Sequence, residues 1–260
     1  MGDKIDKTVL IKNFSRHAAS YDGYTDVQNT AAKILADMLP GDDVASILEI
    51  GCGTGNYTLL LRKKFKGSAI KAIDISDAMI KIAREKMADA KTDFVVEDAE
   101  LMGFDNSYDL ITSNAAFQWL VDPGKLIERS AASLTLSGKL AFSSFGPSTF
   151  GELKRALTAV IGRNVAMAPD LFPGREYLES ALRKNFKSIS ITEKLIKKTY
   201  PSIAELFKKI KYSGTQGSGS DIRRVWSPDL LSKIEKKYLE HFGAVEATYQ
   251  IFFCEAIKCG

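Results

Sequence analysis

Residues 45–55 read ASILEIGCGTG, and this stretch decides the fold. A short apolar run is ended by glycines at positions 51, 53 and 55, which is typical of a buried parallel strand. The glycines let the backbone turn tightly and let a ligand approach without a Cβ in the way. Open α/β sheets bind ligands at the carboxyl ends of their strands. We therefore predict a strand over residues 45–50 followed by a ligand-binding loop.

Strand and helix patterns alternate on the C-terminal side of this loop. Helical spacing begins at Asn56, and apolar runs predict strands over 68–75, 92–98, 108–114 and 139–145. Met79 and Leu126 lie in predicted helices between these strands, and Val27 lies in a helical segment before the loop. This alternation predicts a doubly wound parallel sheet with right-handed crossovers.

The pattern changes after residue 145. Residues 149–152 and 202–205 have the form of capping boxes that open two helices, the first ending near Ile161. Strands are predicted near 188–196 and over 247–257, and a helix from Ser227 to Gly243. We interpret this half as the last two strands of the sheet, with helical insertions that could cap the ligand cleft.

Length and composition exclude several classes of protein. The 260 residues are 45% hydrophobic and 26% charged, a globular composition rather than a disordered one. The sequence has no secretory signal pattern and no run near the roughly 18 apolar residues of a membrane span. Cys52, Cys254 and Cys259 have neither disulfide-framework nor metal-site spacing. We expect a cytoplasmic protein without a metal site.

The formal charge of +4 is unevenly spread. Residues 183–237 contain 14 Lys or Arg against five Asp or Glu, a net charge of +9. Such an asymmetry is typical of a surface that meets an acidic macromolecule, and equally of a solvated lysine-rich face. Both interpretations stay open.

Polar side chains end four of the predicted strands. They are Glu49, Asp74, Asp98 and Asn114, and the ends of neighbouring parallel strands meet at one edge of a sheet. A carboxylate at position 74 is suited to accept two ribose hydroxyls. The dinucleotide fingerprint requires a third glycine where this chain has Asn56, so the loop favours a ligand without a pyrophosphate.

This constellation resembles the class I S-adenosylmethionine-dependent methyltransferases over residues 45–145. The resemblance implies S-adenosylmethionine as cofactor and S-adenosylhomocysteine as product. It implies that Glu49 orients the methionine moiety, that Asp74 binds ribose and that Asp98 meets adenine. The full implied set of cofactor-binding residues is Gln28, Glu49, Gly51, Cys52, Gly53, Gly55, Asp74, Ile75, Met79, Asp98, Ala99 and Asn114.

Three further stretches narrow the resemblance. FSRHAASYD (14–22), NAAFQW (114–119) and FGPSTFGEL (145–153) are similar to the malonyl-acyl-carrier protein O-methyltransferases of biotin biosynthesis, the BioC family. That family implies a Rossmann-like α/β fold, a doubly wound seven-stranded sheet with an N-terminal helical lid and C-terminal helical insertions. The expected single domain spans 1–260, with lid helices over 1–40, a cofactor-binding core over 45–145, and lid insertions and the last two strands over 146–260.

The implied reaction is methyl esterification of the free carboxylate of a malonyl thioester on carrier protein. A carboxylate is already a nucleophile, so no catalytic base is expected. Arg175 is predicted to grip the acceptor carboxylate, because the guanidinium fork matches a carboxylate. The other predicted substrate-binding residues are His17, Tyr21, Gln118 and Trp119. The predicted docking residues for the acidic carrier are Lys208, Lys209, Lys211, Arg223 and Arg224.

Three alternatives remain. One is a carboxyl methyltransferase acting on a small free acid, of the trans-aconitate type. A second is a nucleic-acid methyltransferase, suggested by the sequence pI of 8.8, although no Asn-Pro-Pro-Tyr-type motif follows the fourth predicted strand. A third is a cofactor-binding protein without catalysis. We expect a monomer with neither a membrane nor a nucleic-acid partner.

Overall fold

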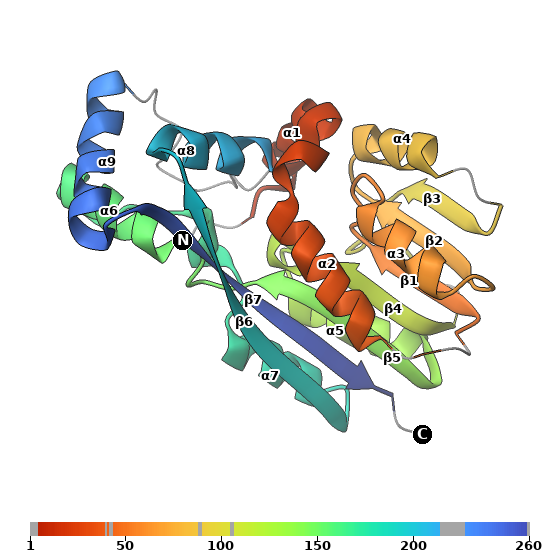
Figure 1. Cartoon of the computed structure of the whole chain (residues 1–260). Helices are drawn as coiled ribbons and strands as arrows, with labels where there is room; N and C mark the ends of the chain where they lie inside the picture. The colour runs from red at the N-terminus through yellow and green to blue at the C-terminus, as the bar shows by residue number, and fades with distance from the viewer. Residues whose placement is uncertain are drawn as a thin grey trace.

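A seven-stranded sheet forms the centre of the computed structural model, which describes residues 5–39, 41, 44–87, 90–104, 107–213 and 227–258 (Figure 1). The strand order is β3-β2-β1-β4-β5-β7-β6. β7 runs antiparallel to both of its neighbours, and the remaining pairs are parallel. The predicted doubly wound seven-stranded sheet is confirmed. The strands are β1 (Ser46–Ile50), β2 (Ala69–Asp74), β3 (Thr92–Val96), β4 (Tyr108–Asn114), β5 (Leu134–Phe145), β6 (Ser188–Tyr200) and β7 (Val245–Ile257).

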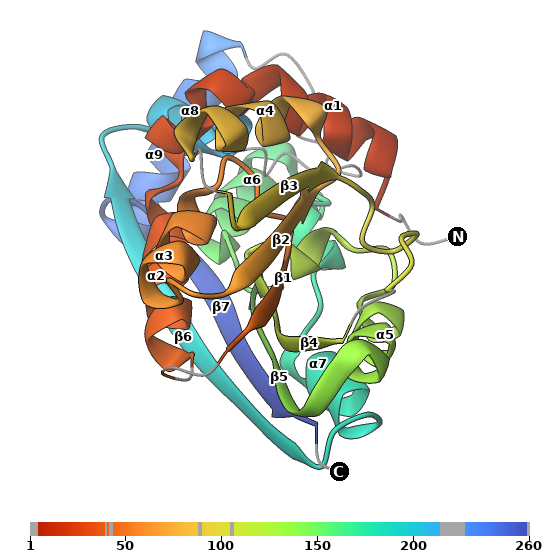
Figure 2. The same ribbon diagram turned by 90° about the vertical axis from the view of Figure 1, so that its right-hand side faces the viewer.

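Helices cover both faces of the sheet (Figure 2). They are α1 (Lys7–His17), the 3₁₀ helix η1 (Ala18–Tyr24), α2 (Asp26–Met38), α3 (Asn56–Lys64), α4 (Asp77–Lys86), η2 (Phe117–Trp119), α5 (Pro123–Ser133), α6 (Gly151–Ile161), η3 (Ala168–Leu171), α7 (Arg175–Arg183), α8 (Ile203–Tyr212) and α9 (Pro228–Phe242). Successive residues of β1 point to opposite faces of the sheet. Ile47 joins the apolar cluster under α2, α3 and α4, whereas Leu48 joins the cluster under α5 and α7.

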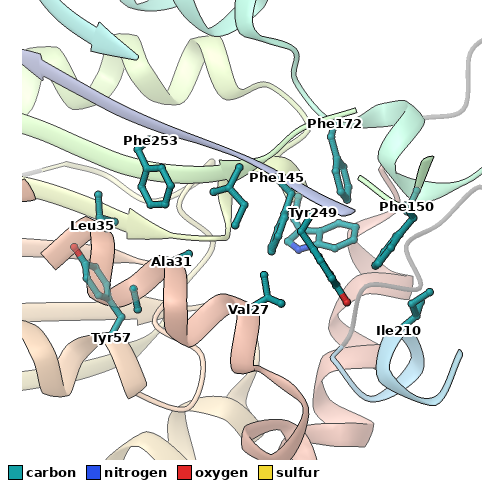
Figure 3. Packing of buried hydrophobic residues seen from close by; sticks show 14 of the residues in the cluster. Val27, Ala31, Leu35, Tyr57, Phe145, Phe150, Phe172, Ile210, Tyr249 and Phe253 are labelled. Atoms are coloured by element: carbon teal, nitrogen blue, oxygen red, sulfur yellow. The ribbon is translucent and has the colours of Figure 1, made fainter. Parts of the chain in front are cut away.

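The apolar face of α2 anchors the N-terminal segment to the sheet. Val27, Ala31 and Leu35 are completely buried, and Phe145 of β5 and Phe253 of β7 lie opposite them (Figure 3). Burying one such side chain stabilises the fold by about 1.5–3 kcal/mol. The helical spacing of these residues therefore fixes the position of the segment that precedes the glycine loop.

The last two strands are longer than their sequence pattern predicts. β6 and β7 pair in register from Ser188 with Ile257 to Tyr200 with Val245, and both extend toward α6, α8 and α9 (Figure 1). β6 lies at the edge of the sheet, so much of its side-chain surface is exposed and its lysines break the alternation. Backbone pairing, rather than burial, sets its length.

The predicted capping box at residues 149–152 is wrong. Phe150, in the left-handed region at φ 62°, precedes α6. Glu152 accepts hydrogen bonds from the backbone N–H and the hydroxyl of Thr248, and the Thr149 hydroxyl bonds the backbone of Gln250. These side chains tie α6 to β7 instead of capping the helix.

The predicted helix starts at Ser202 and Ser227 have their N-caps, although the Glu205 side chain pairs with Lys208 instead of completing the predicted capping box. The Ser202 hydroxyl accepts from Glu205 N at 3.3 Å, and Ser227 caps α9, which ends at the left-handed Gly243. In α3, Leu61 is completely buried, whereas Leu59 is 40% exposed.

Candidate active site

The glycine loop is shaped by close packing at two of its positions. Gly51 and Gly55 have φ values of 69° and 83°, in the left-handed region that favours glycine. A Cβ on Gly51 would overlap the Cβ of Ala116, and one on Gly55 would lie 3.3 Å from the Cβ of Ala83. The loop therefore follows a path that side chains at these two positions would obstruct.

Asp74, at the end of β2, holds the glycine loop in place. Its Oδ2 accepts from Gly53 N at 2.9 Å and its Oδ1 from Ser76 N at 2.8 Å. Burial raises the pKa of Asp74, against the effect of these two hydrogen bonds. A carboxylate has about four lone-pair sites, so it can accept further hydrogen bonds from a ligand.

A pocket opens at the carboxyl ends of β1 to β4 and brings many of the predicted residues together. These are Tyr21, Gly51, Gly53, Asp74, Ile75, Met79, Asp98, Ala99, Asn114 and Trp119. A smaller pocket shares Tyr21, Gly51, Gly53 and Asn114 with the first, and adds Gln28 and Cys52 to its wall. Together the two pockets follow the strand ends, as the sequence predicts.

Glu49 lies within β1 and lines neither pocket. It is 1% exposed, and its Oε2 has no hydrogen-bond partner in the described part of the chain. Burial, with a smaller contribution from the Asp74 charge, raises the pKa of Glu49 to about 8. A buried carboxyl with an unused oxygen fits a ligand that brings a donor or a positive charge.

Replacing Glu49 by Gln is expected to flatten the pH dependence of stability. Between pH 4.5 and 8 the folded state keeps a proton on Glu49 that the unfolded state releases, so the free energy of unfolding falls as the pH rises through this interval. Urea unfolding at pH 5, 6.5 and 8 measures this slope. E128Q, at an exposed position of α5, is the control. Equal slopes in E49Q and the unaltered protein would contradict the assignment.

Asp22 of η1 ties the N-terminal segment across the glycine loop. Its carboxylate accepts from the Thr54 hydroxyl at 2.6 Å and from Asn56 Nδ2 at 3.0 Å, and it pairs with Lys86 at 2.7 Å. Burial opposes its ionisation, but Lys86 and Thr54 outweigh burial and hold the pKa of Asp22 below its usual value. The motif at 14–22 contains this residue, yet its role depends on partners far along the chain.

One face of α1 lines the pocket, and of its three pocket residues only Phe14 belongs to a motif singled out in the sequence. Lys7, Leu10 and Phe14 are spaced by three and four residues, so they share a helix face, and all three reach the pocket. The ring centroid of Phe14 lies 6.1 Å from that of Trp119. The signal that could have found them is the helical spacing itself.

Three predicted substrate residues lie apart from the pocket. Gln118 is buried, donates to Ala115 O at 2.5 Å and accepts from Phe145 N at 3.2 Å, so its amide fastens the loop after β4. The ring of His17 packs 4.9 Å from that of Tyr212. Arg175 is exposed in the first turn of α7 and lines neither pocket.

The predicted docking lysines differ in their surroundings. Lys209 pairs with Asp26, whereas Lys208 reaches Glu205 at 3.6 Å and Lys211 lies over the ring of Tyr212. The other two predicted docking residues, Arg223 and Arg224, lie outside the described residues.

The described residues hold no helix with the length and apolar character needed to cross a membrane. Within those same ranges, no cluster of three or more His, Cys, Asp or Glu is placed to bind a metal ion.

The chain is similar to known methyltransferases in sequence. Residues 48–142 match a family model described as a methyltransferase domain. The chain is 33% identical to malonyl-acyl-carrier protein O-methyltransferase 1 of Ilyobacter polytropus, over 92% of this chain and 89% of that protein. It is also 33% identical to the malonyl-acyl-carrier protein O-methyltransferase of Priestia megaterium, over 98% of both chains.

Solved structures share the fold. The YcgJ protein of Bacillus subtilis matches with a TM-score of 0.63 at 14% identity, over 89% of this chain and 99% of that one. Phosphoethanolamine N-methyltransferase 2 of Haemonchus contortus, solved with S-adenosylmethionine, matches with a TM-score of 0.60 at 19% identity, over 95% of this chain and 57% of that one. At such identities the likeness concerns the fold alone.

Proposed function

Because this chain belongs to the malonyl-acyl-carrier protein O-methyltransferase family of S-adenosylmethionine-dependent methyltransferases, we propose that it methylates the free carboxylate of a malonyl thioester on acyl-carrier protein. The ester serves the early pimeloyl steps of biotin synthesis. The observation that carries the proposal is the similarity to these enzymes over nearly the whole chain, which includes the segments that cover the pocket.

The residues of the pocket fit the cofactor. When bound, S-adenosylmethionine supplies an electrophilic methyl group on a sulfonium. Asp74 has lone pairs for two ribose hydroxyls, and Ile75 and Ala99 offer apolar contacts to adenine. The second pocket, between the glycine loop and α2, has the polar lining that a methionine carboxylate and amine require. Burial raises the pKa of both Cys52 and Tyr57 in the wall of this second pocket, and the charge of Glu49 contributes to the rise, so we assign Glu49 a positioning role there.

The acceptor end of the pocket has apolar walls. Phe14 and Trp119 meet edge to face there, and Trp119 also packs against Phe172 at 5.1 Å between ring centroids. A carboxylate is ionised at neutral pH, so these residues have only to hold the acceptor and exclude water. We do not assign the grip on that carboxylate to Arg175, which lies outside the pocket.

Transfer of a labelled methyl group from S-adenosylmethionine to malonyl-carrier protein tests the function, with acetyl-carrier protein as the matched control. Label on the malonyl form alone, released by mild base as expected of an ester, supports the proposal. Label on trans-aconitate or another free dicarboxylic acid, with none on the carrier, would overturn the acceptor while keeping the cofactor.

We propose further that the carrier docks on the outer face of α8. Lys208 and Lys211 are both exposed and lie three residues apart, so they share a helix face, whereas Lys209 is used internally against Asp26. An acidic partner is steered by such charges. Lys208 and Lys211 can therefore serve docking without disturbing the packing of α8.

The double variant K208E/K211E is expected to raise the KM for malonyl-carrier protein by about tenfold, because exposed interface charges mainly change the rate of association. Its S-adenosylhomocysteine affinity should be unchanged. K63E/K66E, at two exposed lysines near the end of α3, is the matched control. An equal KM increase in both double variants would mean that overall charge, rather than this face, attracts the carrier.

A further inference from the structure

The first turn of α1 places a lysine in the wall of the cofactor pocket. Lys7 Nζ lies 2.7 Å and 2.5 Å from the two carboxylate oxygens of Asp98, and 2.7 Å from Glu100 Oε2. The three side chains are 24%, 17% and 12% exposed. All three side chains keep some contact with solvent, so these charge-assisted contacts bind α1 to the loop after β3 but are screened in part by dissolved salt.

Glu100 extends this junction to a second loop. Its two oxygens accept from the backbone N–H groups of Val121 at 3.1 Å and Asp122 at 2.8 Å. Asp98 also accepts from Glu100 N at 2.9 Å. Lys7 therefore stands where α1, the loop after β3 and the loop after η2 converge.

A second contact holds the opposite end of α1. The hydroxyls of Ser15 and Ser76 lie 2.9 Å apart, which joins α1 to the start of α4. α1 contacts α4, and Figure 2 shows the two helices together at the top of the view. Leu10 and Phe14, between the two fastenings, line the pocket. The helix is thus a cover secured at both ends, and its Lys7 end lies beside Asp98.

We propose that Lys7 is a positioning residue that retains the cofactor. Its ion pairs with Asp98 and Glu100 latch α1 over the adenosine end of the pocket, and they must break before the bound nucleoside can leave. Opening would also leave the two carboxylates facing each other without a cation, which disfavours the open state. The identity of the ligand rests on the proposed function.

The test compares K7M with K12M, which removes an exposed lysine from the same helix. Stopped-flow displacement of S-adenosylhomocysteine should give a dissociation rate about tenfold faster in K7M, with the association rate changed less than twofold, because the lost contacts are charge-assisted. K12M should match the unaltered protein. K7R, which keeps the charge, should restore slow release.

The salt dependence of the dissociation rate provides a second test, because a purely structural role of Lys7 would not change it. Dissociation from the unaltered protein and from K12M should accelerate between 50 and 500 mM NaCl, whereas dissociation from K7M should change little. Release from K7M as slow as from the unaltered protein, or slower, would overturn the latch. The assay needs no methyl acceptor, so its result is independent of whether malonyl-carrier protein proves to be the substrate.

Discussion

Replacing Asp74 by Ala is expected to weaken S-adenosylhomocysteine binding by at least about 100-fold. The variant loses the acceptor proposed for two ribose hydroxyls, and a hydrogen bond to a charged group contributes about 1.5 kcal/mol or more. It also frees Gly53 N and Ser76 N, which the carboxylate now holds at 2.9 and 2.8 Å. Isothermal titration measures the affinity, and methyl transfer at micromolar cofactor should disappear.

Two further variants separate these contributions. D77A removes an exposed carboxylate three residues along, in the first turn of α4, and should bind normally. D74N keeps one carbonyl oxygen at the same place and should fall between D74A and the unaltered protein. If D74A bound S-adenosylhomocysteine within threefold of the unaltered protein, Asp74 would not be the ribose acceptor.

Replacing Gly51 by Ala is expected to lower the free energy of unfolding by about 3 kcal/mol and to abolish cofactor binding. The left-handed backbone costs a side-chain-bearing residue about 1–2 kcal/mol, and overlap with Ala116 adds about 1–3 kcal/mol. Thermal unfolding should show a loss of roughly 6–10 °C for a chain of this size.

A glycine without close neighbours separates strain from overlap. Gly162 has φ 76° and open space where a Cβ would lie, so G162A should cost only the backbone strain. The double variant G51A/A116G removes the overlapping methyl group of Ala116. Its free energy of unfolding should therefore recover by the amount by which the loss in G51A exceeds the loss in G162A. No recovery in the double variant would show that Ala116 is not the obstacle.

The sequence predicted the core of the fold because its signals are local. Apolar runs ended by glycines or polar residues mark β1, β2 and β4, and the strand ends place Asp74, Asp98 and Asn114 at one edge without further information. The pocket follows from that arrangement. The spacing of residues within single strands and helices is therefore enough to predict where the pocket lies.

Contacts between distant elements could not be predicted in this way. Glu152 bonds to Thr248, 96 residues away, although its local pattern is that of a capping box. Gly146 leaves no room for a Cβ because the side chain of Gln250 lies against it. The segment at 145–153 that resembles the family thus packs α6 on β7. The similarity of this segment to the family therefore reflects shared packing around the site, and the segment contributes no reacting group to it.

Lys7 and Gln118 show in opposite ways that a motif does not determine which polar side chains face the pocket. Lys7 lines the pocket but belongs to no motif, because its partners Asp98 and Glu100 lie about 90 residues further along the chain. Gln118 belongs to a motif, yet both ends of its amide bond to backbone. Whether a polar side chain faces a ligand or its own chain depends on three-dimensional neighbours.

The position of β7 has a consequence for how the protein is made. β7 follows every other strand in chain order, yet it lies between β5 and β6. Until residues 245–257 have left the ribosome, a nascent chain exposes the unpaired backbone of β5, and β6 has no partner in the sheet. Unpaired strand edges invite association with other chains. A messenger truncated before this strand therefore yields an aggregation-prone product, even though it encodes every residue of the cofactor pocket.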